Sequence, residues 1–412
     1  MQSEPRQSEG ELPLLKGFRI LEVGHFVAAP FCTRLLADLG ADVIKIEPPG
    51  GDPVRQWGEM VDGNSLWWSM HGRNKRSVTI DLKSPKGPEL LLALAAQCDA
   101  VVENMRPGQI DRLGIGPKEL RQANPDLVIC HISGYGQTGP GRDRAAFGLI
   151  GEAVGGLRHL TNHAPGVTDL PPVRVGVSIG DSVSGIYAAL GIVSALLSRE
   201  RGRGRNGLTV DVALSESVLS LMEGMLPEYG YLDKIKQPTG GAISTAAPTN
   251  AYPSRDGKWV LIGANSDPLF ARLAKLMERP DFLKNPDYKG NALRVIHHAA
   301  LDQIIGEWSR GFDGADLIEM LEGVGIPCST AYTAEDIARD EQYLARRMIL
   351  EVEDPLFSRP IMHTGIVPHV PEAPGTVRWA GPAIGAHTEE VLQELLGISS
   401  SAIENFQRES AA

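Results

Sequence analysis

The sequence predicts an α/β protein with a parallel sheet at its centre and a second, smaller α+β part. Short runs of β-branched and apolar residues alternate with helical patterns between residues 19 and 133, as in repeated βα units. Apolar periodicity fades between residues 226 and 250, where loop-forming residues accumulate. The chain has 412 residues, which exceeds one typical domain. We therefore expect a Rossmann-like large domain and a separate small domain.

The first part of the chain supplies most of the predicted sheet. Strands are expected at residues 19–23, 41–47, 77–82, 100–104 and 127–133. Helices are expected at residues 30–40, where Gly40 is the predicted C-cap, at 85–98 and around Lys118. Because strands and helices alternate, the strands should run parallel, with helices on the faces of the sheet.

Later segments complete the large domain and form the small one. A long helix rich in small residues is expected at 182–202, then a strand at 208–214 and a helix at 215–225. The small domain is predicted to contain a hairpin around residues 255–257 and a helix at 267–277. The C-terminal tail is predicted to contain two strands and a helix. We assign residues 1–226 to the first part of the large domain, 227–330 to the small domain and 331–412 to a segment that returns to the large domain.

Composition narrows the class of protein. Lys and Arg number 40 against 51 Asp and Glu, a formal charge of -11, which argues against nucleic acid as the main partner. The four cysteines have no metal or redox spacing and are expected to be reduced thiols. The first dozen residues lack the apolar core of a secretory signal, and no uninterrupted apolar run approaches the ~18 residues of a membrane span. These features favour a cytoplasmic protein without a membrane partner.

A dinucleotide-binding site is one hypothesis for a sheet of this kind. Glu47 ends the second strand, where an acidic side chain can hold a ribose hydroxyl. The turn after the first strand reads GHFVAAP, however, and lacks the G-x-G-x-x-G pattern that lets backbone approach a pyrophosphate. A structural role for Glu47 is the better interpretation, and a dinucleotide oxidoreductase stays a distant alternative.

Asp181 is the acidic residue with the most informative position. It follows Gly180 and precedes the long predicted helix. Aspartate is a preferred N-cap residue, so a capping role explains the position without any catalysis. A carboxylate at that end of a helix would also be kept ionised by the helix dipole.

Six segments in a fixed order resemble the family III CoA-transferases, also called the CaiB/BaiF family, which includes formyl-CoA:oxalate and succinyl-CoA:glutarate transferases. The segments are LKGFRILEVGHFVAAPF, LGADVIKIEPPGGDPVR, GRNKRSVTIDLKSPKG, VVENMRPGQIDRLGIG, ISGYGQTGP and GVSIGDSVSGIYAALG. The resemblance covers nearly the whole chain.

The resemblance implies that Asp181 is the catalytic nucleophile. In this family the corresponding aspartate attacks an acyl-CoA thioester, and the reaction passes through an aspartyl anhydride and an enzyme–CoA thioester. The resemblance implies no metal and no permanently bound cofactor, with coenzyme A entering as part of the substrate. It also implies a homodimer of interlocked chains.

Residues that contact coenzyme A are proposed from basic segments and from the resemblance. The basic segment GRNKRS offers Arg73 and Lys75 for the phosphates, and the resemblance favours a further set. The full set of candidates is His25, Arg73, Lys75, Asn104, Met105, Arg112 and Tyr135. Surface charge for the cations, a packed histidine and a core tyrosine remain open alternatives.

Two departures decide the subclass. The α-methylacyl-CoA racemases of the same family have a histidine where this chain has Phe147, so paired acid–base proton transfer is disfavoured and a racemase is kept as the alternative. Formyl-CoA transferase has a glutamine where this chain has Val27, which disfavours oxalate and formate. The later part of the chain is more similar to transferases that take succinyl-CoA and a dicarboxylic acid.

A non-catalytic CoA-binding subunit would tolerate loss of the nucleophile, and the presence of Asp181 argues against it.

Overall fold

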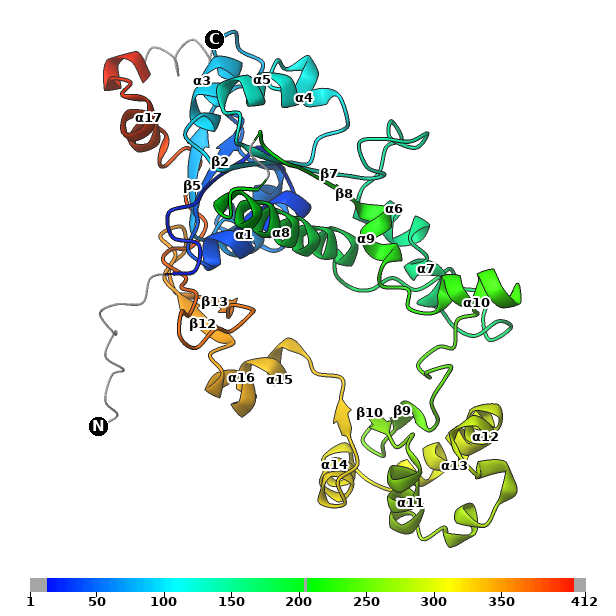
Figure 1. Ribbon diagram of the computed structural model, residues 1–412. Coiled ribbons are helices and arrows are strands. Elements are labelled where there is room, and N and C mark those ends of the chain that lie inside the picture. Colours follow the sequence, from blue (N-terminus) through cyan, green and yellow to red (C-terminus); the bar gives the residue numbers. More distant parts are fainter. Residues whose placement is uncertain (1–12, 204–205, 404–412) are drawn as a thin grey trace. The chain divides into compact units, whose positions relative to one another are not determined.

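The computed structural model describes residues 13–203 and 206–403, and it divides the chain into two compact units (Figure 1). The first unit combines the chain up to Leu157 with Val175–Leu226 and the chain from Ala345 onward. The second unit consists of Arg158–Arg174 and Pro227–Leu344. It therefore includes more of the chain than the predicted small domain, residues 227–330. The N-terminal dozen residues and part of the basic turn at 202–207 lie outside the described residues.

A six-stranded parallel sheet forms the centre of the first unit. Its strands are β1 (Arg19–Glu22), β2 (Asp42–Glu47), β5 (Lys75–Thr79), β6 (Ala100–Glu103), β7 (Val128–Ser133) and β8 (Thr209–Ala213). Their spatial order is β5-β2-β1-β6-β7-β8, which is the doubly wound order 3-2-1-4-5-6. The order reverses between β1 and β6. In doubly wound folds, ligands bind beside the carboxyl ends of the strands at such a reversal.

The other elements of the first unit surround this sheet. Its helices are α1 (Ala28–Asp38), α2 (Leu66–His71), α3 (Gly87–Ala95), α4 (Gln109–Arg112), α5 (Pro117–Ala123), α6 (Gly148–Val154), α8 (Ile179–Glu200), α9 (Leu214–Leu219) and α17 (Thr388–Leu396). The short elements are the 3-10 helix η1 (Pro53–Gln56) and the paired strands β3 (Met60–Val61), β4 (Asn64–Ser65), β12 (Ile349–Val352) and β13 (Ile361–Thr364). Three helices contain residues of both units: α7 (Leu157–Leu160), α10 (Met225–Leu232) and α16 (Glu341–Ala345).

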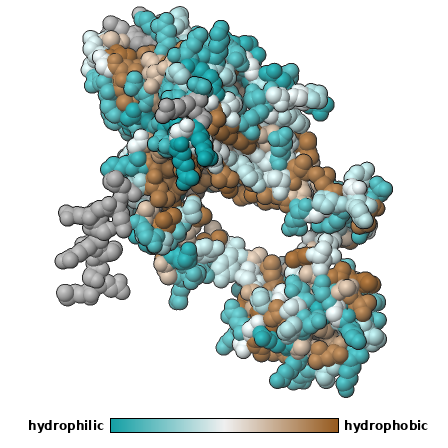
Figure 2. Space-filling view, in the orientation of Figure 1, coloured by the Kyte–Doolittle hydropathy of each residue, from teal (hydrophilic) through white to brown (hydrophobic). Residues whose placement is uncertain are grey.

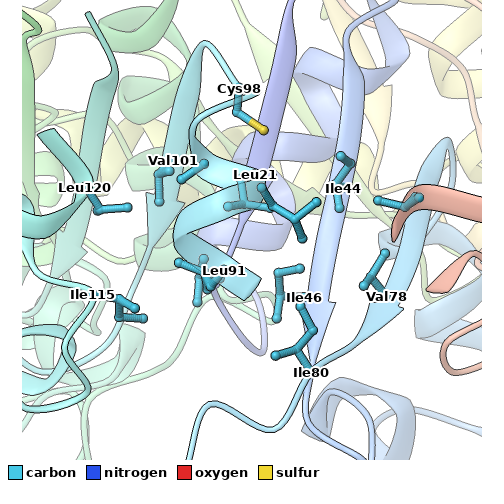
Figure 3. Close-up of a cluster of buried hydrophobic side chains, with 14 of the residues drawn as sticks. Leu21, Ile44, Ile46, Val78, Ile80, Leu91, Cys98, Val101, Ile115 and Leu120 are labelled. Atoms are coloured by element: carbon cyan, nitrogen blue, oxygen red, sulfur yellow. The ribbon is translucent and has the colours of Figure 1, made fainter. Parts of the chain in front are cut away.

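Both faces of the sheet are apolar and covered. On one face, strand residues such as Leu21 and Ile44 form a core cluster with Leu91 of α3 (Figure 3). Val391 of α17 belongs to the same cluster. On the other face, neighbouring strand residues such as Ile20 contact α1 and α8. This alternation follows from the two-residue period of a strand, and burial of both faces is typical of parallel sheets.

The 22-residue helix α8 is long and apolar enough, by length and composition, to cross a membrane. Half of its apolar window is buried, and α8 packs along α1 and against β7 and β8 (Figure 1). Glycine permits this packing, because a Cβ at Gly185 would lie 2.9 Å from the Ala28 carbonyl oxygen. We interpret α8 as a core helix of the first unit.

The second unit is a small α+β fold. Its elements are β9 (Thr249–Pro253), β10 (Trp259–Gly263), α11 (Asp267–Leu276), η2 (Pro280–Leu283), η3 (Pro286–Tyr288), α12 (Asn291–Ile296), α13 (His298–Ser309), α14 (Gly314–Gly323), β11 (Cys328–Thr330) and α15 (Ala334–Arg339). Strands β9 and β10 form the expected antiparallel hairpin, and β11 adds to its other edge. The helices enclose a separate core around Phe270 and Leu317.

Several boundaries differ from those expected. The strand predicted at residues 77–82 begins two residues earlier, at Lys75, and ends at Thr79. The helix predicted at 215–225 ends at Leu219, and a second helix begins at Met225. The tail strands β12 and β13 pair with each other and do not join the large sheet. Helix α17, in contrast, packs beside β5.

Candidate active site

The turns after β1 and β6 meet where the strand order reverses. The Asn104 side-chain oxygen accepts a hydrogen bond from the His25 backbone N–H at 2.9 Å. The Asn104 amide nitrogen donates one to the His25 carbonyl oxygen, also at 2.9 Å. Asn104, a predicted contact of coenzyme A, therefore fixes the backbone of His25. Burial, followed by the ammonium of Lys45, lowers the pKa of His25, so its imidazole is neutral at pH 7.

Phe26, the next residue in the β1–α1 turn, is held in a left-handed conformation. Its φ angle is 61°, which is unfavourable for a side chain with a Cβ. The Phe26 N–H donates to Asp52 Oδ1 at 3.1 Å, and Asp52 in turn pairs with Lys45 Nζ at 2.7 Å. The conformation persists because the surrounding contacts determine it.

Below this turn lies a fully buried group of charges. Glu22, at the end of β1, pairs with Lys45 Nζ at 2.6 Å and with Lys75 Nζ at 2.8 Å. Burial alone would raise the pKa of Glu22, but the two ammonium groups outweigh it and lower the pKa to about 2. Burial, with repulsion from Lys45, lowers the pKa of Lys75 to about 8.

Two cations predicted to hold CoA phosphates are core residues instead. Lys75 is fully buried and also donates to the Pro30 carbonyl oxygen. Arg73 is 1% exposed, and its guanidinium pairs with Asp38 at 2.6 Å. Because both charges are satisfied inside the protein, their positions argue against contact with phosphates. Met105 is likewise a buried member of the core.

Glu47 has the structural role expected from the sequence. Its two carboxylate oxygens accept hydrogen bonds from Arg55 Nε and Nη2, each at 2.7 Å. The Ser77 hydroxyl donates to the same carboxylate at 2.6 Å. The group is fully buried, so it does not face a ribose.

Asp181 lies in the first turn of α8 and is partly exposed. The N-cap of the helix is Ser178, so the expectation that Asp181 directly precedes the helix was wrong by three positions. At the third helical position the carboxylate is still next to the positive end of the helix dipole, which favours its negative charge.

Glycines make room for the Asp181 carboxylate. A Cβ at Gly148, the first residue of α6, would lie 2.1 Å from Asp181 Oδ2. A Cβ at Gly180 would lie 2.8 Å from the Gly148 carbonyl oxygen. The buried carboxylate of Glu152, one turn along α6, accepts a long hydrogen bond of 3.5 Å from the Gly180 N–H. Gly148 and Glu152 were not predicted from the sequence, although their four-residue spacing places them on one helix face.

Aromatic side chains connect the surroundings of Asp181 with those of His25. Phe147 directly precedes Gly148, and its ring centroid lies 6.4 Å from that of Phe26. The Phe26 ring is 4.8 Å from Trp57. Phe147 is 72% exposed, so these rings offer an accessible apolar surface beside the carboxylate. Such a surface suits an acyl chain or pantetheine.

Tyr135 lies in the loop after β7 and is half-buried. The loop is fixed at its base, because the Gln137 N–H donates to Asp211 Oδ2 at 2.9 Å. Gly136 has a φ angle of 85°, which glycine adopts at little cost. The Arg144 guanidinium lies 6.0 Å from the centre of the Tyr135 ring. Tyr135 is therefore a loop residue, as expected from the glycines around it.

Two guanidinium groups converge on Gly108, in the loop after β6. A Cβ at Gly108 would lie 3.5 Å from Arg112 Nη1 and 4.0 Å from Arg142 Nη2. Both arginines are exposed. Arg112 was a candidate from sequence, whereas Arg142 was not, because it follows a different strand and only the fold brings the two together. Paired, exposed guanidinium groups are well suited to a phosphate.

The described residues also bear on metal binding and on thiol reactivity. Among residues 13–203 and 206–403, no group of three or more His, Cys, Asp and Glu side chains could hold a metal ion. Burial raises the pKa of the thiols of Cys32, Cys98 and Cys130, which makes them poor nucleophiles. The nucleophile predicted from the sequence, Asp181, is partly exposed.

Comparison with known proteins defines the class. The model of CoA-transferase family III matches residues 15–388. The chain is 44% identical over 395 residues to a succinyl-CoA–D-citramalate CoA-transferase of Chloroflexus aurantiacus, covering 95% of this chain and 96% of that protein. It is 36% identical to the beta subunit of a succinyl-CoA–L-malate CoA-transferase of the same organism, covering 95% and 96%.

A solved structure agrees with this class. A CAIB/BAIF family protein from Brucella suis superposes with a TM-score of 0.81 at 30% identity, covering 93% of this chain and 99% of that one. The chain belongs to CoA-transferase family III, and the enzyme is a CoA-transferase. The resemblance noted from sequence is confirmed.

Proposed function

We propose that this enzyme transfers coenzyme A from an acyl-CoA donor, succinyl-CoA, to a dicarboxylic acid, with Asp181 as the nucleophile. The observation that carries the proposal is the position of Asp181. Its carboxylate is partly exposed at the positive end of α8 and lies against Gly148, beside an accessible aromatic surface. Relatives named for succinyl-CoA with citramalate or malate support the choice of donor and of acceptor class.

The proposed reaction divides one exchange into four acyl transfers. Asp181 attacks the thioester carbonyl carbon, the C–S bond breaks, and the CoA thiolate leaves a mixed anhydride. The thiolate then attacks the aspartyl carbonyl, which releases the donor acid and leaves CoA as a thioester on Asp181. The acceptor carboxylate attacks this thioester and expels the thiolate again. Finally the thiolate attacks the acceptor acyl carbon, which forms the new acyl-CoA and restores the carboxylate.

Other residues hold the substrate in this scheme. We assign the phosphates of coenzyme A to Arg112 and Arg142, whose guanidinium groups converge at Gly108. His25 lies near the reactive end of the pantetheine, where its neutral imidazole can hydrogen-bond without adding charge. Tyr135 would contact the acyl group from the loop after β7. The two hydrogen bonds between the Asn104 side chain and the His25 backbone keep His25 in place.

A homodimer is part of the proposal. Helix α8, which carries Asp181, exposes Ile186, Leu190 and Leu197, at 50%, 60% and 53% exposure. Their spacing of four and seven residues puts them on one face of the helix. Figure 2 shows hydrophobic side chains gathered on the surface where α8 lies in Figure 1. A second copy of the chain would cover this stripe.

Substitution of the nucleophile tests the proposal. Asp181→Ala should lower the rate of CoA exchange from succinyl-CoA by roughly 10⁴-fold or more, because no other group can form the anhydride. Circular dichroism and thermal unfolding check that the variant folds. Asp316→Ala, at an exposed aspartate of the second unit, is the matched control and should retain full activity. Retained exchange in Asp181→Ala would refute the assignment.

A further inference from the structure

Arg34, in the second half of α1, carries a positive charge in a buried position. The residue is 6% exposed, and its guanidinium lies 4.5 Å above the Phe31 ring. Its Nε atom is enclosed and makes no hydrogen bond with any described residue. A buried cation without a hydrogen-bonded counter-charge is costly, so such a position is retained where an anion is supplied.

The natural partner on the same helix is already occupied. Asp38 lies one turn after Arg34, at the spacing of a helical ion pair. Its Oδ2 atom instead pairs with Arg73 at 2.6 Å, and its Oδ1 atom accepts a hydrogen bond from Asn74 at 2.9 Å. The fold thus directs the nearby carboxylate to Arg73 and leaves Arg34 for another anion.

Two imidazoles complete what we call the Arg34 anion site, composed of Arg34, His71 and His363. The Nδ1 atoms of His71 and His363 are both enclosed without a hydrogen-bond partner in the described chain. Burial and then Arg34 lower the pKa of His71 to about 3; burial, Arg73 and Arg34 lower that of His363 to about 4. Helix α2, which ends at His71, packs against both α1 and β13, and the Ser69 hydroxyl of α2 lies 2.9 Å from His363 Nε2. Both rings are neutral at pH 7 and able to donate a hydrogen bond.

Contacts connect this site with the candidate active site. The His71 ring lies 6.1 Å from Trp67, whose ring is 6.2 Å from Trp57 in the aromatic surface beside Phe26. On the other side, a Cβ at Gly185 would lie 3.0 Å from the Phe31 ring under Arg34. Gly185 follows Asp181 by one helical turn, about 6 Å along α8. All these residues belong to the first unit.

We propose that Arg34 binds the distal carboxylate of a dicarboxylate substrate, with His71 and His363 as hydrogen-bond donors. This inference rests on the proposed function, in which one carboxyl group of the substrate reacts at Asp181. A dicarboxylate has a second, unreactive charge that must be stabilised as the acid enters an apolar surface. A guanidinium group can bind this second carboxylate through two parallel hydrogen bonds. The carboxylate would then be the hydrogen-bond acceptor that Arg34 Nε lacks.

The test compares acids that differ only in the second charge. Succinate and butyrate serve as acceptors, and succinyl-CoA and butyryl-CoA as donors, with Arg34→Gln, Arg34→Met and Arg34→Lys. We expect the glutamine and methionine variants to lose about 10- to 100-fold in kcat/KM with succinate, as for a lost charged hydrogen bond, and little with butyrate. The lysine variant should recover part of the loss. Arg339→Gln, at a mostly exposed arginine, is the control.

A binding readout keeps the test independent of turnover. Succinate should raise the unfolding temperature of the wild type but not of Arg34→Met, whereas without succinate the variant should be at least as stable. Equal loss with both acids, or loss only through a weaker dimer, would overturn the inference. Wild-type enzyme that exchanges CoA with neither acid would instead refute the proposed function.

Discussion

Gly148 gives the Asp181 carboxylate the space that it occupies. Any side chain at position 148 would begin 2.1 Å from Asp181 Oδ2, far inside van der Waals contact. The carboxylate, rather than a flexible chain end, would have to move. Since Asp181 is held on the first turn of a packed helix, its displacement changes the direction from which it meets a thioester.

Gly148→Ala should therefore lower kcat by about 10²-fold, the scale of an ångström-sized misplacement of a reacting group. Steady-state kinetics with succinyl-CoA measure the effect. Gly323→Ala is the control, because a Cβ at this helical glycine meets nothing within 4 Å. Wild-type kcat in Gly148→Ala would show that the packing against Asp181 is unimportant.

For single residues, the sequence indicated which side chains are candidates for the site better than it indicated which groups surround them. Asp181, His25 and Arg112 were proposed as site residues through the resemblance of their motifs, and these roles stay predictions. Arg73 and Lys75 were predicted to contact CoA phosphates, with surface charge as the alternative. Their buried ion pairs were not expected, because the counter-charges, Asp38 and Glu22, are more than thirty residues away in the chain. Only the pairing of β2 with β1 and β5 brings those charges together.

At the scale of elements, the buried charges of Glu22, Lys45 and Lys75 connect β1, β2 and β5, and Lys45 also donates to the Gly24 carbonyl oxygen beside His25. Glu22 has a folded pKa of about 2, below its ordinary 4.5. Its ionisation therefore stabilises the fold fully above pH 4.5, and this contribution is lost as the pH falls towards 2. The unfolded chain binds the proton first on acidification.

Glu22→Gln should destabilise the protein by roughly 3 to 5 kcal/mol at pH 7, because it leaves two buried ammonium groups without their carboxylate. The loss of stability between pH 4.5 and 2 should also be smaller than in the wild type. Thermal unfolding across this pH range measures both. Glu59→Gln, at an exposed glutamate, should change neither, and an unaltered acid response in Glu22→Gln would contradict the account.

Elements with strong periodicity were predicted well. All six strands of the sheet were expected, because strands buried on both faces are continuous apolar runs. Helix α6 was not expected, since Gly148, Gly151 and the preceding glycines mask its pattern. Strands β12 and β13 pair with each other and do not extend the large sheet. Strand propensity could not predict this, because it does not identify the partner of a strand.

At the scale of the whole molecule, the exposed stripe of α8 predicts self-association. Leu190→Glu should convert the dimer to a monomer, because it places a charge in the centre of the apolar face. Sedimentation velocity measures the mass. Ile296→Glu, at a 70% exposed position in the second unit, is the control and should remain a dimer. A monomeric wild type, or a dimer unaffected by Leu190→Glu, would contradict the proposed interface.

The central claim is that Asp181 becomes acylated, and the sequence offers a direct test of it. Trypsin should release residues 175–199 as one peptide, in which Asp181 is the only acidic side chain. After reaction with succinyl-CoA and trapping with hydroxylamine, the account predicts a hydroxamate on this peptide by mass spectrometry. No modification there under conditions of active turnover, or a modification on another peptide, would contradict it.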